Sequence, residues 1–233
     1  MSSDEPTTQD PSPTPTSIPK SSALTPHPDF FFEDLYIAIE DHLFKVPRRT
    51  FENSSDVFCD MFAVPVPGGQ PADGSCTEHP LLLTGATTEE FVQLLKVLTY
   101  DEPSELSPTE WEGALKLANL WQFTRVRDNA IMALQPIVYK LSAVEIILKA
   151  RQYDVNEWLT AAVCTMARRA GAVSKEDAQV IGIDDALKIA QVREEALDIV
   201  VEKHGRFFID FKKRDAVDYV PTIERIFGIQ EPE

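Results

Sequence analysis

The chain has 233 residues and a mass of 26.1 kDa, and its 22 Lys and Arg residues against 38 Asp and Glu residues give a formal net charge of −16. An acidic protein of this kind repels phosphate backbones, which argues against direct nucleic-acid binding, and no apolar run exceeds five residues, which argues against a membrane span. Three widely spaced cysteines, Cys59, Cys76 and Cys164, and an acidic N-terminus without an apolar stretch indicate an intracellular protein of the cytoplasm or nucleus.

The N-terminal segment, residues 1–28, differs in composition from the rest of the chain. It contains seven of the 17 prolines and eleven Ser or Thr residues, but only four apolar residues. Such a segment buries too little apolar surface to offset the conformational entropy lost on folding. We therefore expect residues 1–28 to form a disordered tail.

Three consecutive phenylalanines, Phe30, Phe31 and Phe32, follow the tail. We expect them to cover the hydrophobic core beneath the next predicted element, a β-hairpin. The alternative is a dimer or partner surface, because contiguous exposed aromatic residues mark interaction sites. The cluster is therefore a candidate interface.

The residues after this cluster predict the hairpin, with strands at 35–39 and 42–46 and a tight turn at Glu40-Asp41. The two-residue period of a strand places four apolar side chains on one face. These residues are Ile37, Ile39, Phe44 and Val46.

A short helix, a loop and one strand are predicted next. Ser54 is placed to cap the helix, which would bury Phe58, Met61 and Phe62. Residues 63–79 are rich in Pro and Gly and predict a loop. The wholly apolar run 81–83, bounded by Pro80 and Gly85, predicts a buried strand.

From residue 87 to about residue 204 the pattern is helical. Most helix starts show a capping box, in which a hydroxyl or carboxyl side chain and a Glu three residues later satisfy free N–H groups reciprocally. The pairs are Thr87 with Glu90, Ser107 with Glu110, Ser142 with Glu145 and, as a weaker match, Asp154 with Glu157. Ser174 and Asp184 are predicted to cap two further helices. No repeat of 33–45 residues is visible, which argues against a solenoid.

The N-terminal half carries a set of family-specific residues at characteristic spacing. The set is Asp34-Leu35, Glu40-Asp41, Phe44, Arg48, the run 54–62, the strand and helix over 81–100, and the helices over 111–134. Together these residues resemble a BTB/POZ domain covering residues 29–135. The resemblance implies an α+β fold, in which a small mixed sheet is wrapped by helices. Trp121 and Phe123 lie where two helices turn back onto the hairpin, so we expect both in the core.

The C-terminal part, residues 136–233, is predicted to be an all-helical extension. Its segments 148–159 and 170–187 and the pair Arg193-Glu194 resemble the helical extension of BTB proteins that are abundant in basidiomycete fungi. The wider family uses such a region to space the BTB domain from a recognition domain.

The resemblance also implies functional residues. In BTB domains of transcription regulators, the counterparts of Asp34 and Arg48 form a charged pocket near the dimer interface. The alternative for this pair is a structural salt bridge that ties the strand to the following helix.

Recruitment of the cullin ubiquitin-ligase scaffold is a disfavoured alternative. Cullin-binding members of the family carry a hydrophobic anchor followed two residues later by a carboxylate. Val64 and Val66 are the candidate anchors here, but Val66 and Gly68 occupy the positions that would need the carboxylate. The usual His before the Arg is also replaced, by Pro47.

Signals for catalysis or metal binding are weak. Cys76-x-x-His79 supplies two of the four ligands that a structural zinc needs. Cys59 and Cys164 lie among apolar residues, and we expect both to be buried. We therefore expect no enzyme activity, cofactor or metal, and a thiol- or metal-dependent enzyme using the 63–79 loop is the disfavoured alternative.

The sequence thus predicts a non-catalytic protein–protein interaction module that serves as an adaptor or scaffold. Its partners are expected to be proteins, including a second copy of the chain, rather than nucleic acid or membrane. The candidate interface residues are Phe30, Phe31, Phe32, Asp34, Arg48, Val64 and Val66.

Overall fold

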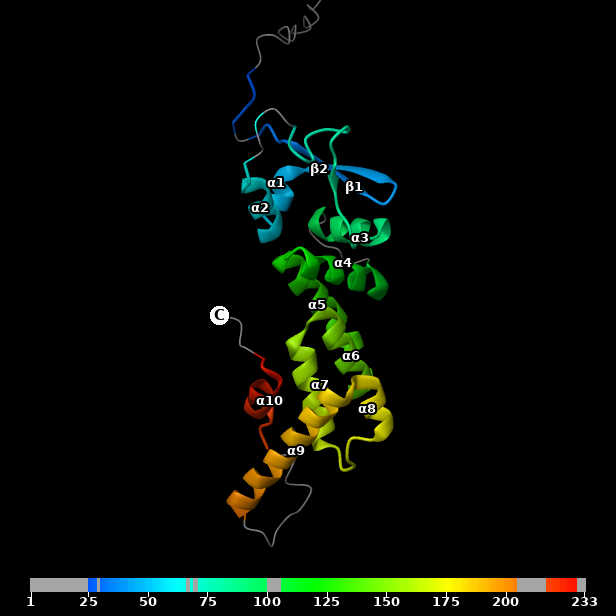
Figure 1. Cartoon of the computed structure of the whole chain (residues 1–233), viewed down its shortest axis with the longest axis vertical. Coiled ribbons are helices and arrows are strands. Elements are labelled where there is room, and N and C mark those ends of the chain that lie inside the picture. Colours follow the sequence, from blue (N-terminus) through cyan, green and yellow to red (C-terminus); the bar gives the residue numbers. More distant parts are fainter. Residues whose placement is uncertain are drawn as a thin grey trace, which may run out of the picture.

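The computed structural model describes residues 25–28, 30–65, 68, 71–99, 106–204 and 217–229, with side chains up to residue 197 in the last helix before the gap. Residues 1–24 of the expected tail, and four positions of the expected 63–79 loop, lie outside the described residues. The described chain is elongated, with the sheet at one end and stacked helices leading away from it (Figure 1).

The N-terminal half contains the sheet and five helices. These elements are β1 (Asp34–Ile39), β2 (His42–Pro47), α1 (Arg48–Glu52), α2 (Asp56–Ala63), β3 (Leu81–Leu82), α3 (Thr88–Thr99), α4 (Pro108–Leu120) and α5 (Thr124–Val138). The rest of the described chain is helical. Its elements are α6 (Ala143–Tyr153), α7 (Asn156–Arg168), α8 (Lys175–Ile181), α9 (Ile183–His204) and α10 (Val220–Phe227). The expected α+β architecture with a helical extension is confirmed.

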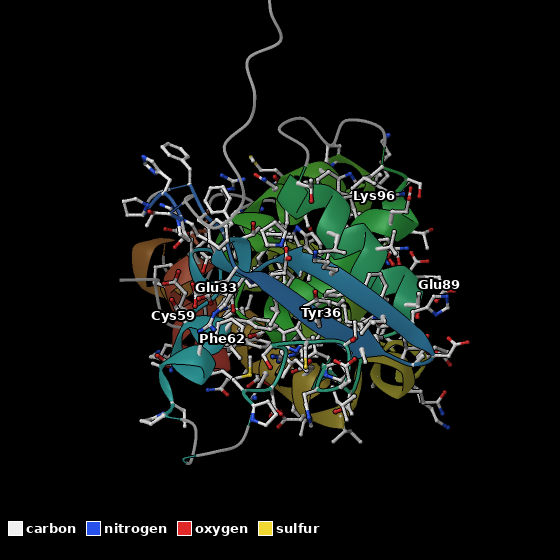
Figure 2. All side chains as sticks on the ribbon, turned by 90° about the horizontal axis from the view of Figure 1, so that it is seen from above. Glu33, Tyr36, Cys59, Phe62, Glu89 and Lys96 are labelled. Carbon is white, nitrogen blue, oxygen red and sulfur yellow. The ribbon has the colours of Figure 1, made fainter. Side chains whose placement is uncertain are left out.

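The three strands form a mixed sheet in the order β2-β1-β3. β1 pairs with β2 antiparallel and with β3 parallel, and the register sets Ile37 opposite Phe44 and Leu35 opposite Val46. Leu35, Ile37 and Ile39 are buried, so the predicted hairpin and its apolar face are confirmed. Figure 2 looks down on the opposite, outer face of this sheet, where Tyr36 lies.

An aromatic cluster fills the core between the sheet and the helices. Phe51, Phe58 and Phe123 lie within 5.7 Å of one another, measured between ring centroids, and Trp121 lies 5.8 Å from Phe58 and 6.0 Å from Phe91. Phe123 is fully buried and Trp121 is 7% exposed, which confirms the core positions expected for both.

Most of the predicted helix starts are confirmed, because a capping box depends only on residues within one turn. The structure has reciprocal capping bonds at these pairs: Thr87 with Glu90, Ser107 with Glu110, and Ser142 with Glu145. Ser174 likewise caps α8 together with Asp177.

Three predicted caps are wrong by position. Ser55, not Ser54, caps α2 through a bond from the Phe58 N–H. Asp154 ends α6 in the left-handed conformation (φ 51°), which Asp tolerates, and Val155 precedes α7. Asp184 lies in the first turn of α9 instead of capping it.

Two burial predictions are also wrong. The strand expected over 81–83 covers only Leu81 and Leu82, and Leu82 is 72% exposed because strand alternation places it on the outer face. Cys164 is buried as expected, but Cys59 is exposed on α2.

Candidate functional site

The three phenylalanines before β1 are exposed. Phe30, Phe31 and Phe32 keep 74%, 69% and 54% of their surface accessible, so the expectation that they cover the core is wrong. The inner side of the hairpin already packs against the aromatic cluster of α1, α2 and α3, which leaves no apolar space for them. We call Phe30, Phe31, Phe32 and Arg49 the phenylalanine surface.

Arginines of α1 border the phenylalanines. The guanidinium carbon of Arg49 lies 5.9 Å from the Phe32 ring centroid, and among the described residues no carboxylate pairs with Arg49. Pro28, Glu33, Asn53 and both ends of α1 complete a pocket of about 330 Å³ against Phe31 and Phe32. The surface therefore combines exposed aromatic rings with a cation that pairs with no carboxylate in the described part of the chain.

Arg48 also lines this pocket, and its guanidinium reaches toward α2. Its guanidinium carbon lies 4.4 Å from the ring centroid of Phe62, a cation–π contact, and its Nε donates to Glu52 Oε1 at 2.7 Å. Glu33 Oε2 lies 3.4 Å from Arg48 Nη1. Figure 2 shows Glu33 at the start of β1 and Phe62 on the neighbouring α2.

The salt bridge between Asp34 and Arg48, considered above as the alternative for this pair, is not formed. Asp34 instead lies 2.7 Å from Lys45 Nζ, across the β1–β2 ladder, and this hydrogen bond raises the pKa of Lys45. Asp34 and Pro47 are directly opposite in the register, so Asp34 points to the outer face of the sheet with Lys45, while Arg48 already belongs to α1. The ion pair that joins the start of the strand to α1 is therefore the one between Glu33 and Arg48.

The candidate cullin anchors lie beyond α2. Val64 follows the helix as its C-cap residue and is 66% exposed. Val66 lies outside the described residues. Val64 therefore adds an exposed apolar side chain near Phe62, with no acidic residue two positions later.

The cysteines show no catalytic or metal-binding geometry within the described part of the chain. Cys76 and His79 face each other in an isolated antiparallel bridge that closes a tight loop. No group of three or more ligating side chains is found among the described residues. Burial raises the pKa of the Cys164 thiol, which disfavours the nucleophilic thiolate.

A model of the BTB/POZ domain family matches residues 27–137. The chain carries a BTB/POZ domain. None of the curated proteins matches the chain. BTB/POZ domains mediate protein–protein interactions, dimerisation included, so this domain makes the chain a protein-interaction module. None of the described helices combines the length and the apolar character required to cross a bilayer.

Sequence reasoning missed Arg49 as part of the exposed surface. The signal was present in the Arg48-Arg49 pair, but only one of the two could be matched to the family's motif. The rotation of α1 decides which arginine faces Phe62 and which faces Phe32, and that rotation depends on burial of Phe51 in the core.

Proposed function

We propose that this BTB/POZ protein is an intracellular scaffold or adaptor that associates with itself, and that the phenylalanine surface carries the association. The observation behind the proposal is the exposure of three consecutive phenylalanines directly before β1. Exposed contiguous aromatic residues are costly in water and are enriched at the centres of protein interfaces.

The composition of the surface suits a protein partner better than a small ligand. Aromatic and Arg side chains are the residues that most often dominate binding energy at interfaces. The pocket beside them is shallow and polar, whereas small-molecule sites are concave and mostly apolar. Arg48 lines the same pocket and would form part of the rim of this surface.

The test is the association state of the full chain across the micromolar concentration range, measured by sedimentation velocity. We expect the wild type to form oligomers and the Phe31→Ser/Phe32→Ser variant to sediment as a monomer. Met132→Ser is the matched control, because Met132 is 65% exposed on α5 and lies outside the phenylalanine surface.

Two results would contradict the proposal. A wild type that remains monomeric at every concentration would exclude self-association. A double variant that associates as strongly as the wild type would show that the interface lies outside the phenylalanine surface. The circular dichroism spectrum and unfolding midpoint of each variant establish that the fold is retained.

A further inference from the structure

The C-terminal helix α10 covers a face that α7 and α9 form together. α10 packs chiefly against these two helices, and Figure 1 shows it beside them. Tyr219, directly before α10, and Ile223 within it are buried, and Ile226, Phe227 and Ile229 pack partly buried against the same core. We call the surface of α7 and α9 under α10 the α10-binding face. The contact resembles an amphipathic helix seated in the groove of a receptor.

The C-terminal end of α10 lies against two cations. The guanidinium carbon of Arg151 is 5.6 Å from the ring centroid of Phe227, and Lys188 Nζ is 5.7 Å from it. Arg151 also binds Asp185 through two hydrogen bonds. Lys188 pairs with Asp184. Departure of α10 would therefore leave neither cation without a carboxylate.

The other polar contacts of α10 are exposed. Arg225 pairs with Glu195 of α9, and the Arg225 side chain keeps 60% of its surface accessible. Exposed ion pairs contribute little to stability. The guanidinium carbon of Arg168 in α7 lies 5.5 Å from the Tyr219 ring centroid. Burial of Tyr219 and Ile223 is thus the main contact that holds α10 in place.

Three features indicate that α10 can leave this face while the rest of the extension stays folded. It has eight residues, fewer than the roughly 12–15 that an isolated helix needs in water. Residues 205–219 connect it to α9, whereas helix–helix connections usually have about 2–8 residues. α7 packs directly on both α6 and α9, so these helices do not need α10 to meet.

We propose that the α10-binding face is a binding site for an amphipathic helix of a partner protein, and that α10 occupies it in cis and so controls access. The proposal goes beyond the self-association proposed above, because it assigns a second surface to the adaptor. The contacts of α10 define the ligand. It carries an aromatic residue, an aliphatic residue four positions later, a basic residue at six and an aromatic residue at eight, as do Tyr219, Ile223, Arg225 and Phe227.

A second copy of the chain does not supply this helix. The covalent connection places α10 beside its own face at an effective concentration in roughly the millimolar range. α10 of a second copy has the same sequence, so at micromolar concentration it loses the competition. A partner helix enters only if it binds more tightly than α10 at the same positions.

The test uses the full chain with Tyr219→Ser/Ile223→Ser, which removes the two buried anchors of α10 and changes no residue of α7 or α9. We call it the released variant. The probe is a fluorescently labelled peptide with the sequence of residues 217–229. By fluorescence anisotropy, the wild type should bind the probe at least tenfold more weakly than the released variant. Met132→Ser/Ile137→Ser, at exposed positions of α5, is the matched control and should bind like the wild type.

A charge exchange locates the probe on the α10-binding face. A probe with Arg225→Glu should bind the released variant about fivefold more weakly, because Glu195 then faces a carboxylate. Glu195→Arg in the released variant should restore binding of that probe and weaken binding of the original one. A released variant that shows no such preference would place the probe elsewhere and overturn the site.

Three further results would contradict the proposal. A folded released variant that does not bind the probe would exclude a helix-binding face. A wild type that binds the probe as tightly as the released variant would exclude control by α10. A Phe31→Ser/Phe32→Ser chain that still dimerises, and becomes monomeric with Ile223→Ser, would show that α10 of a second copy is the occupant.

Hydrogen exchange of the wild type covers the case in which the released variant does not fold. Amides of α10 should exchange at least tenfold faster than those of α7, because α10 opens locally while α7 stays folded. Equal protection of the two helices would show that α10 leaves only when the whole extension unfolds, and would overturn the proposal.

Discussion

Arg127 Nη2 in α5 lies 2.7 Å from the main-chain oxygen of Asp154, the residue that ends α6 in the left-handed conformation. The same arginine binds Asn119 Oδ1, and Asn119 Nδ2 in turn donates to the main-chain oxygen of Tyr153. Two side chains of α4 and α5 thus satisfy the carbonyl groups left free where α6 ends. This contact joins the BTB/POZ domain to the helical extension.

Arg127→Ala should destabilise the protein by about 1.5–3 kcal/mol, because a hydrogen bond from a charged donor is lost and a carbonyl group at the domain junction is left without its partner. Urea unfolding of the full chain measures the change. Arg125→Ala, two residues earlier and exposed, should change stability by less than about 0.5 kcal/mol. Equal effects of the two substitutions would show that the junction contact contributes nothing specific.

Trp121→Ala should cost about 3–5 kcal/mol of unfolding free energy, since it removes a nearly buried indole that contacts Phe58 and Phe91. Trp121→Phe keeps an aromatic ring in the same site and should cost clearly less. Thermal or denaturant unfolding followed by circular dichroism checks both. A loss below about 1 kcal/mol for the alanine variant would place the indole outside the core.

Glu110 predicts an acid-dependent contribution to stability. Its hydrogen bonds with Lys96 and with Ser107 lower its pKa from 4.5 to about 2. A carboxyl group whose pKa is lower in the folded state stabilises the fold above its unfolded pKa, and this contribution is lost as the pH falls toward the folded value. The difference in melting temperature between wild type and Glu110→Gln should therefore shrink between about pH 4.5 and 2.

The control for that series is Asp128→Asn, because Asp128 is an exposed carboxylate of α5. Its melting-temperature difference from the wild type should show no such dependence. A Glu110→Gln difference that stays constant over the same pH range would remove the electrostatic explanation.

The protein should bind the N-terminal region of a cullin weakly or not at all. The exposed Val64 offers an anchor, but Val66 stands where a carboxylate would be required. Loss of a charged hydrogen-bond partner typically costs about 1.5–3 kcal/mol, or roughly ten- to a hundredfold in affinity. Isothermal titration of the full chain tests this, and Val66→Asp measures the gain from restoring the carboxylate. A sub-micromolar complex of the wild type would restore the ubiquitin-ligase adaptor hypothesis.

Local features of this chain were predictable because their causes lie within a few residues. The hairpin follows from alternation around Glu40-Asp41, and the helix starts follow from a hydroxyl residue and a Glu three positions later. The BTB/POZ fold could be predicted because the spacing of Asp34, Phe44 and Arg48 along the chain resembles the spacing typical of that family. The same local reasoning failed at Asp154, because the residue that can cap a helix can also end the preceding one.

The sequence by itself determined the order of elements, their caps and the apolar residues available for a core. Only the tertiary structure decided which of those apolar residues are buried. Phe30, Phe31 and Phe32 are as hydrophobic as Phe51 and Phe58, yet the first group is exposed and the second forms the core. The reason is that burial depends on which elements meet in space, and the hairpin's inner face is filled by helices that follow it in the chain. A groove between α5, α7 and α10 arises in the same way, because it is lined by residues as far apart in the sequence as Arg127 and Ile229, which no local pattern connects.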